Sequence, residues 1–136
     1  MFENSLGDGY PNKENKEYIR KKTAFTFYDP KNATDELVDE VYETVNNRGK
    51  AIRVITMAKS ALRHNLRKDL NKINVPVKLI WGQNDTITPP FVAEEFEKLL
   101  PNASLDFIDK CGHAAMMEHP NEFNQILDAW LQKRGL

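Results

Sequence analysis

The residues of this sequence best suited to chemistry are an aspartate and a histidine, Asp85 and His113. Imidazole titrates near neutral pH, so a histidine can take a proton from a serine or cysteine nucleophile and return it to the leaving group. A carboxylate on the other ring nitrogen fixes the tautomer and stabilises the imidazolium that forms. Asp85 and His113 therefore predict an acid and base pair, provided that the fold brings them together.

Two short apolar runs lie just before these side chains and are predicted to be strands. Residues 76–81 (PVKLIW) are rich in strand formers, and turn residues separate them from Asp85. Residues 104–108 (SLDFI) largely alternate polar and apolar side chains, and a short loop separates them from His113. Because parallel strands present functional side chains at their carboxyl ends, we expect Asp85 and His113 to meet within hydrogen-bonding reach.

A helix is predicted between the two strands, as in a βαβ unit. Thr88 is expected to cap its amino-terminal end, and Pro89 suits its first turn. Apolar residues then recur at helical spacing: Val92, Phe96, Leu99 and Leu100. A final helix is predicted after Pro120, with a wide apolar face for the sheet: Phe123, Ile126, Leu127, Trp130 and Leu131. The predicted fold class is therefore α/β.

Two stretches, 76–85 (PVKLIWGQND) and 111–120 (CGHAAMMEHP), resemble the C-terminal part of the α/β-hydrolase family. In that family the chain order is nucleophile, acid and histidine, and here Asp85 precedes His113. The resemblance implies that Asp85 is the orienting carboxylate and His113 the general base of a serine-type hydrolase. Such an enzyme cleaves an ester, amide, thioester or activated carbon–carbon bond by acyl transfer.

The nucleophile of this family is missing from the sequence. The sequence contains no Gly-x-Ser-x-Gly motif. Its serines are Ser5, Ser60 and Ser104, and none of them is expected at a strand-to-helix elbow. Cys111 lies so close to His113 in sequence that both side chains would struggle to reach one substrate atom. We therefore expect this chain to be the C-terminal portion of a truncated hydrolase and to be inactive alone. The alternative is a non-catalytic binding or dimerisation module derived from a hydrolase.

Three helices are predicted before the first strand, over residues 17–27, 32–46 and 50–70. Asn32 can cap the second of them. The resemblance implies that these helices form the cap that roofs the substrate pocket. We expect residues 1–72 to be an N-terminal loop and helical cap, and residues 73–136 to be the last two parallel strands of the core with their helices. The predicted fold is thus a partial α/β-hydrolase fold.

Other residues near His113 are weaker candidates. Met116 and Met117 are candidate substrate contacts, although methionines more often fill gaps in apolar cores. His119 could join His113 on a metal, but no third ligand is evident, so neither a metal site nor a cofactor is predicted. His64 lies in a cap helix and is expected to face solvent or a neighbouring helix.

Composition narrows the classes of partner and compartment. The 136 residues include 19 basic and 20 acidic side chains, so a net charge of -1 favours neither nucleic acid nor an anionic membrane. One cysteine, no apolar leader and no membrane-length apolar run indicate a cytoplasmic protein with a small-molecule substrate. Because a first strand without its usual neighbour has an open edge, we expect a homo-oligomer or association with a missing N-terminal fragment.

Overall fold

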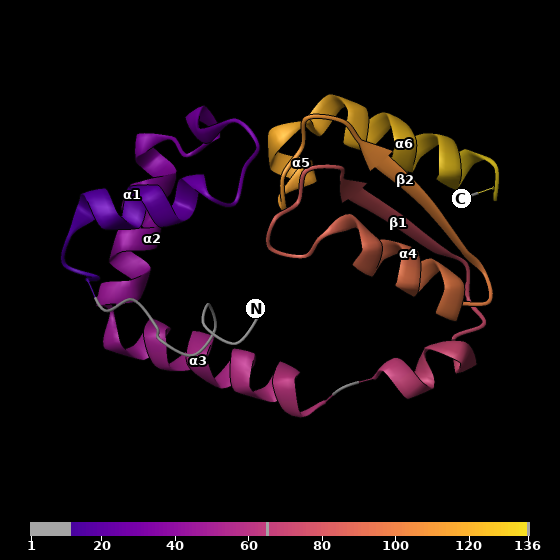
Figure 1. Cartoon of the computed structure of the whole chain (residues 1–136), viewed down its shortest axis with the longest axis horizontal. Coiled ribbons are helices and arrows are strands. Elements are labelled where there is room, and N and C mark those ends of the chain that lie inside the picture. The colour runs from indigo at the N-terminus through magenta and orange to yellow at the C-terminus, as the bar shows by residue number, and fades with distance from the viewer. Residues whose placement is uncertain (1–11, 65, 136) are drawn as a thin grey trace. The chain divides into compact units, whose positions relative to one another are not determined.

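The computed structural model describes residues 12–64 and 66–135, which form two compact units (Figure 1). Of these residues, 12–23 and 33–64 form one unit, and 24–32 and 66–135 form the other. We call the segment Ala24–Asn32 the strap, because it leaves the first unit to join the second. The predicted division into cap and core near residue 72 stays a prediction, and the predicted loop over residues 1–11 lies outside the described residues.

Within its described residues, the first unit contains three helices: α1 (Lys16–Ala24), α2 (Asp35–Asn46) and α3 (Arg48–Arg63). Ile19 and Val38 are fully buried and form its centre. The predicted cap at Asn32 is wrong, because Thr34 caps α2 by accepting a hydrogen bond from the Leu37 amide at 3.3 Å. Asn32 instead ends a short 3-10 turn within the strap.

Two of the predicted cap helices are shorter than expected. The first ends at Ala24, and turns occupy the rest of the range predicted as helix. The long helix predicted over residues 50–70 ends at Arg63, and a 3-10 helix follows over Arg67–Lys72. His64 leaves the helical conformation, and both its amide and its ring Nδ1 bond to the Ser60 carbonyl. Helix α3 therefore ends with two hydrogen bonds from His64 to one carbonyl, and no glycine or proline is present at this end.

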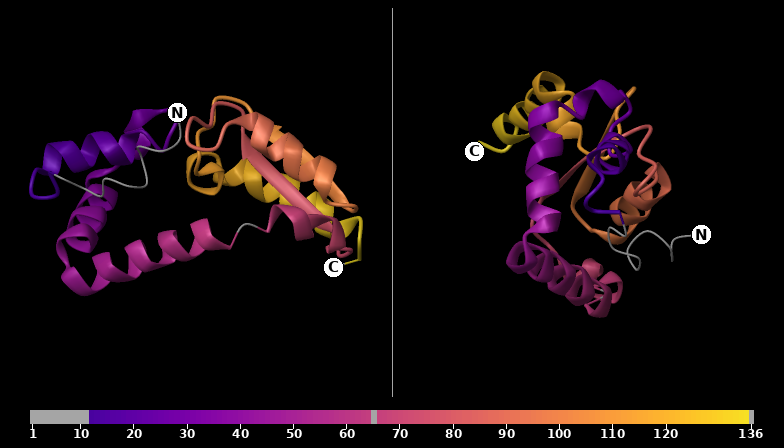
Figure 2. Two further views of the ribbon diagram at one scale, coloured as in Figure 1. Left: turned by 60° about the horizontal axis from the view of Figure 1, so that its bottom comes forward. Right: turned by 90° about the vertical axis from the view of Figure 1, so that its left-hand side faces the viewer.

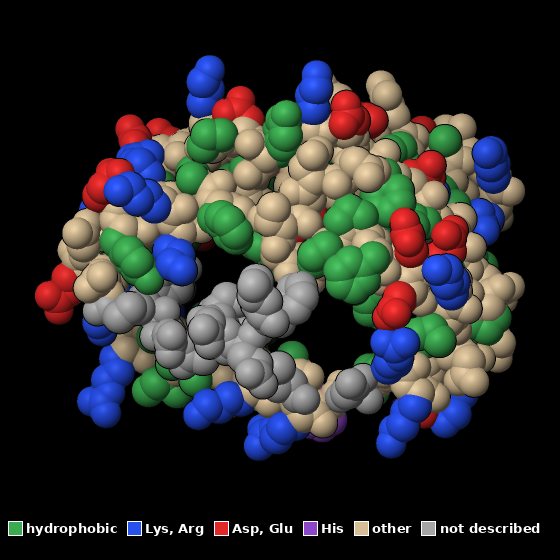
Figure 3. All heavy atoms as spheres, viewed as in Figure 1, with side chains coloured by type: hydrophobic (Ala, Val, Ile, Leu, Met, Phe, Trp, Pro, Cys, Tyr) green, Lys and Arg blue, Asp and Glu red, His purple; other side chains and the backbone are tan. Residues whose placement is uncertain are grey.

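The surface of α3 combines apolar and basic side chains. Ile52, Val54, Ile55 and Met57 are between 50% and 72% exposed. All the charged residues of α3 are basic, and Figure 3 shows blue side chains along this part of the surface. Within the described ranges, no helix is both long enough and apolar enough to cross a membrane.

The second unit holds the predicted βαβ arrangement. Strands β1 (Val77–Gly82) and β2 (Ala103–Ile108) are parallel, with Val77 beside Ala103 and Gly82 beside Ile108. Helix α4 (Pro90–Leu99) connects them, and α5 (Ala115–Glu118) and α6 (Pro120–Gln132) follow β2. Figure 2 shows the pair of strands between α4 and α6 from two further directions.

Neighbouring residues of β1 contact different helices, because side chains alternate between the faces of a strand. Ile80 packs against a buried cluster that includes Ile108, and Phe123 and Ile126 of α6 pack against the same cluster. Trp81 faces α4, where its ring centroid lies 6.4 Å from that of Phe96. The two helices thus cover opposite faces of the sheet, and the strand ends are left to carry the polar residues.

Candidate active site

The two strands end at the same edge, where the loops after them are joined by backbone hydrogen bonds. The Gln83 amide donates to the Ile108 carbonyl at 2.9 Å, and the Asn84 amide donates to the Cys111 carbonyl at 2.9 Å. Gly82 permits this approach, because a Cβ there would lie 2.0 Å from the Gly112 carbonyl oxygen. The loop that carries the aspartate is therefore fixed against the loop that carries the histidine.

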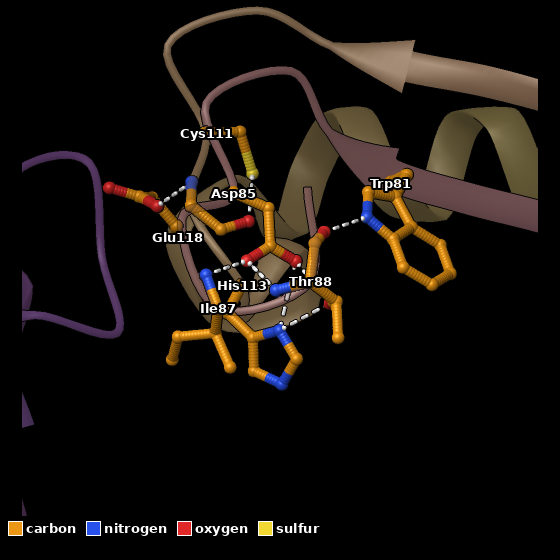
Figure 4. A network of polar contacts seen from close by, with 8 residues as sticks. Trp81, Asp85, Ile87, Thr88, Cys111, His113 and Glu118 are labelled. Carbon is orange, nitrogen blue, oxygen red and sulfur yellow. Dashed lines mark hydrogen bonds and ion pairs between the residues drawn. The ribbon is translucent and has the colours of Figure 1, made fainter. Parts of the chain in front are cut away.

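The expected contact between His113 and Asp85 is present. The ring Nδ1 of His113 lies 2.9 Å from Asp85 Oδ2, and since a carboxylate only accepts, Nδ1 carries the proton (Figure 4). Asp85 is 4% exposed, whereas the His113 side chain is 42% exposed. In Figure 4 the other ring nitrogen points away from the polar network, so Nε2 is free to meet a group outside it.

Thr88 completes this network and was missed from the sequence. Its hydroxyl donates to Asp85 Oδ2 at 2.7 Å, and its oxygen lies 3.1 Å from His113 Nδ1. The prediction that Thr88 caps α4 is wrong, because Pro89 occupies the cap position and no side chain caps this helix. The threonine three residues after the aspartate was a usable signal, since short polar side chains often bond within such turns.

Hydrogen bonds keep the Asp85 carboxylate charged. Burial acts to raise the pKa of Asp85, but bonds from the Thr88 amide, His113, the Thr88 hydroxyl and the Ile87 amide together hold the pKa below its usual value. The two amides donate to Oδ1 at 2.9 Å from Thr88 and 2.8 Å from Ile87. A carboxylate held in this way stays ionised at neutral pH and keeps its charge beside the imidazole.

Cys111 is poorly suited to serve as a nucleophile. It belongs to the loop between β2 and α5, residues 109–114, which we call the site loop, and its side chain is fully buried. Burial, followed by the negative charges of Glu118, Glu122 and Asp85, raises the pKa of the Cys111 thiol to about 11. The reactive form of cysteine is the thiolate, so this thiol is nearly all in its unreactive form at neutral pH. This agrees with the sequence argument against it.

The remaining candidates take different positions in the second unit. Met116 and Met117 are 54% and 51% exposed on α5, and their role as substrate contacts stays a prediction. His119 donates from Nε2 to the Lys110 carbonyl at 2.9 Å, so it steadies the loop before His113. Lys110 needs such support because its φ of 50° is unusual for a residue with a side chain.

Comparison with known proteins adds a family to this geometry. Residues 11–120 match the family described as alpha/beta hydrolase fold. The chain belongs to the α/β-hydrolase fold family. Its helices and parallel strand pair are a partial version of that fold, as predicted from the sequence.

Three relatives illustrate how much of a hydrolase this chain spans. A 2-hydroxy-6-oxononadienedioate/2-hydroxy-6-oxononatrienedioate hydrolase from Pseudomonas sp is 30% identical over 82% of this chain and 40% of that protein. A pimeloyl-(acyl-carrier protein) methyl ester esterase from Nitrosomonas europaea is 42% identical over 47% of this chain and 25% of that protein. The crystal structure of MGS-MChE2, an alpha/beta hydrolase from a lagoon-sediment metagenome, is 59% identical with a TM-score of 0.68. The match with MGS-MChE2 covers 75% of this chain and 47% of the MGS-MChE2 chain. This chain therefore spans less than half the length of each of the three relatives.

Proposed function

We propose that this chain supplies the acid and base of a serine-type hydrolase, with Asp85 orienting His113 and with the nucleophile supplied by a segment outside the sequence given. The observation that carries the proposal is the 2.9 Å bond between His113 Nδ1 and Asp85 Oδ2. With its proton fixed on Nδ1, the ring presents an unprotonated Nε2 that can accept a proton from a nucleophile.

The proposed chemistry is acyl transfer. His113 Nε2 takes the hydroxyl proton of the serine while the serine oxygen attacks the acyl carbon, and the same nitrogen then protonates the leaving group. Water next attacks the acyl-enzyme with His113 again as base, which releases the acid and restores the serine. The substrate is a small molecule with an ester, amide, thioester or activated carbon–carbon bond, as suggested by the esterase and hydrolase names of the relatives.

A chimera tests this function. The portion of MGS-MChE2 that this chain does not match would be joined to the chain, and hydrolysis of a chromogenic ester measured. We expect the chimera to hydrolyse the ester, Asp85→Asn to lower kcat by about 10⁴-fold, and His113→Ala to abolish turnover. The control is His64→Ala, because that exposed histidine ends α3 and has no proposed role in catalysis. An active chimera that is indifferent to His113→Ala would overturn the proposal.

Association is part of this proposal. In the described part of the chain β1 pairs with β2 alone, so one edge of β1 presents backbone groups that a further strand can bind. We expect the chain to pair this edge with the rest of a hydrolase core or with a second copy of itself. Sedimentation at micromolar concentration tests self-association of the chain alone, and sedimentation of a mixture with the unmatched portion of MGS-MChE2 tests pairing with the rest of a core. A compact monomer in both experiments would contradict the expectation.

A further inference from the structure

A second polar network lies beneath the site loop and centres on Glu118, at the end of α5. Glu118 Oε2 accepts hydrogen bonds from the amides of Gly112 at 2.7 Å and Tyr28 at 3.1 Å. Glu118 Oε1 accepts from the Asp29 amide at 2.7 Å and from Asn32 Nδ2 at 3.2 Å. One carboxylate therefore joins the site loop to the strap, and all the residues involved belong to the second unit.

A carboxylate is the side chain that suits this position. Ionised glutamate accepts on both oxygens and donates nothing, so it satisfies four converging donors. Hydrogen bonds to a charged acceptor are roughly twice as strong as neutral ones. Glutamine has nearly the same shape, but its amide nitrogen would face two of these donors and repel them.

The site loop is held on both sides of the bond between Gly112 and His113. The Gly112 amide bonds to Glu118, and the His113 amide donates to the Thr26 carbonyl of the strap at 2.8 Å. Contact with the strap is so close that a Cβ on Gly112 would lie 2.6 Å from the Thr26 carbonyl oxygen and 2.7 Å from the Tyr28 nitrogen. The strap cannot shift without moving the backbone of His113.

We infer that Glu118 is a positioning residue for His113. It fixes the Gly112 amide directly and the strap through Tyr28 and Asp29, and the strap in turn holds the His113 amide. The backbone of His113 is thereby set so that Nδ1 meets Asp85. This role in catalysis rests on the proposed function of His113, whereas the effect of Glu118 on the site loop does not.

Amide exchange and proton NMR of the full chain test the inference without a substrate. In Glu118→Gln we expect the amides of Gly112, Tyr28 and Asp29 to exchange at least roughly tenfold faster, while amides of β1 keep their rates. The proton signal of the bond between His113 Nδ1 and Asp85 should broaden or disappear. A residue that only stabilised the whole fold would raise exchange in β1 as well.

The matched control is Glu122→Gln, an exposed residue of α6. Glu118 and Glu122 both act on the charge environment of Cys111, so this variant removes a similar charge without removing the four bonds. We expect it to match the wild type in both measurements. Equal effects of the two variants would assign the result to charge alone and overturn the inference, as would wild-type exchange of Gly112 in Glu118→Gln.

A second variant covers the case in which Glu118→Gln does not fold. Asn32→Leu keeps a similar size and removes one side-chain amide from the strap, which donates to Glu118 Oε1 and to the Asp29 carbonyl, both at 3.2 Å. We expect exchange of the Asp29 and Tyr28 amides to rise about threefold, and unchanged rates would overturn the inference.

In the active chimera, Glu118→Gln should lower kcat roughly tenfold with KM unchanged, because orientation of the base matters in the chemical step. If His113→Ala has no effect there, the function fails while the exchange result still decides the role of Glu118.

Discussion

The site loop of the second unit and helix α3 of the first unit differ in how much of each is buried or bonded to other segments. In the site loop, Cys111 is fully buried, the Gly112 amide bonds to Glu118 of α5, and the His113 amide bonds to Thr26 of the strap. In α3, Ile52, Val54, Ile55 and Met57 remain at least half exposed. From this difference we expect the conformation of the site to depend on polar contacts around a few atoms, and α3 to tolerate substitution over much of its surface.

A pair of glycine substitutions gives the largest expected contrast. At Gly82 a Cβ would lie 2.5 Å from the Cys111 carbonyl oxygen and closer still to that of Gly112, so backbone must move. We expect Gly82→Ala to lower the free energy of unfolding by roughly 4 kcal/mol. Gly49→Ala in α3 would place its Cβ 3.4 Å from Asn47 Oδ1 and should add about 0.5–1 kcal/mol. Urea denaturation measures both, and equal effects would remove the contrast.

The charge of Asp85 should appear in the pH dependence of stability. Its pKa is lower in the folded chain than the usual value of about 3.9, so the charged form stabilises the fold above that pH. This stabilisation is lost as pH falls from about 4 through the folded pKa. Asp85→Asn should cost about 1–3 kcal/mol at pH 7 and should flatten the acid side of the stability curve.

The control for Asp85→Asn lies in the first unit. Asp39 forms an exposed ion pair with Lys16, and such pairs contribute about 1 kcal/mol or less. We expect Asp39→Asn to leave the acid side of the curve as it is in the wild type. Thermal unfolding between pH 2 and pH 7 compares the variants, and an unchanged slope in Asp85→Asn would contradict the expectation.

Two threonines sharpen the comparison at smaller scale. The Thr88 hydroxyl donates to the buried Asp85, whereas the Thr56 hydroxyl donates to the Ile52 carbonyl within α3 at 2.8 Å. We expect Thr88→Val to cost about 1 kcal/mol, because Asp85 loses one donor, and Thr56→Val to change stability by less than about 0.5 kcal/mol. Denaturant midpoints measure the pair, and a greater loss in Thr56→Val would reverse the interpretation.

The smallest effect is expected on the exposed side of α3. Met57 is 72% exposed, so Met57→Gln should change the free energy of unfolding by less than about 0.5 kcal/mol. A loss above 1 kcal/mol in the same denaturation experiment would show that another part of the protein covers Met57. The comparison between the two regions would then need to be revised.

The sequence was informative where local patterns decide the structure. Apolar runs closed by turn residues predicted both strands, and the parallel βαβ arrangement then predicted that Asp85 and His113 would meet. Local patterns failed where a competing bond decides. Thr88 was predicted to cap a helix, but its hydroxyl donates to Asp85 instead. The helix predicted over residues 50–70 ends earlier, where the ring of His64 bonds to the Ser60 carbonyl.

The network of Glu118 could not have been predicted from local patterns. Its partners Tyr28 and Asp29 are separated from it by 90 and 89 positions in the sequence. The sequence predicted a helix through residue 27 of the strap, and nothing in the sequence marks the segment that the strap contacts. Only the folded chain shows that the strap occupies the space that a side chain on Gly112 would need.

The bond between Trp81 and Thr88 gives the site an intrinsic optical signal. The indole Nε1 of Trp81 donates to the Thr88 carbonyl at 2.8 Å, so we expect its fluorescence to respond to changes in the turn that holds Asp85. The second tryptophan of the chain, Trp130, lies under the Arg134 guanidinium, 4.3 Å from its ring centroid. In a Trp130→Phe variant, the remaining emission would come from beside the acid of the site. Binding of a substrate or a partner there could then be followed without attaching a dye.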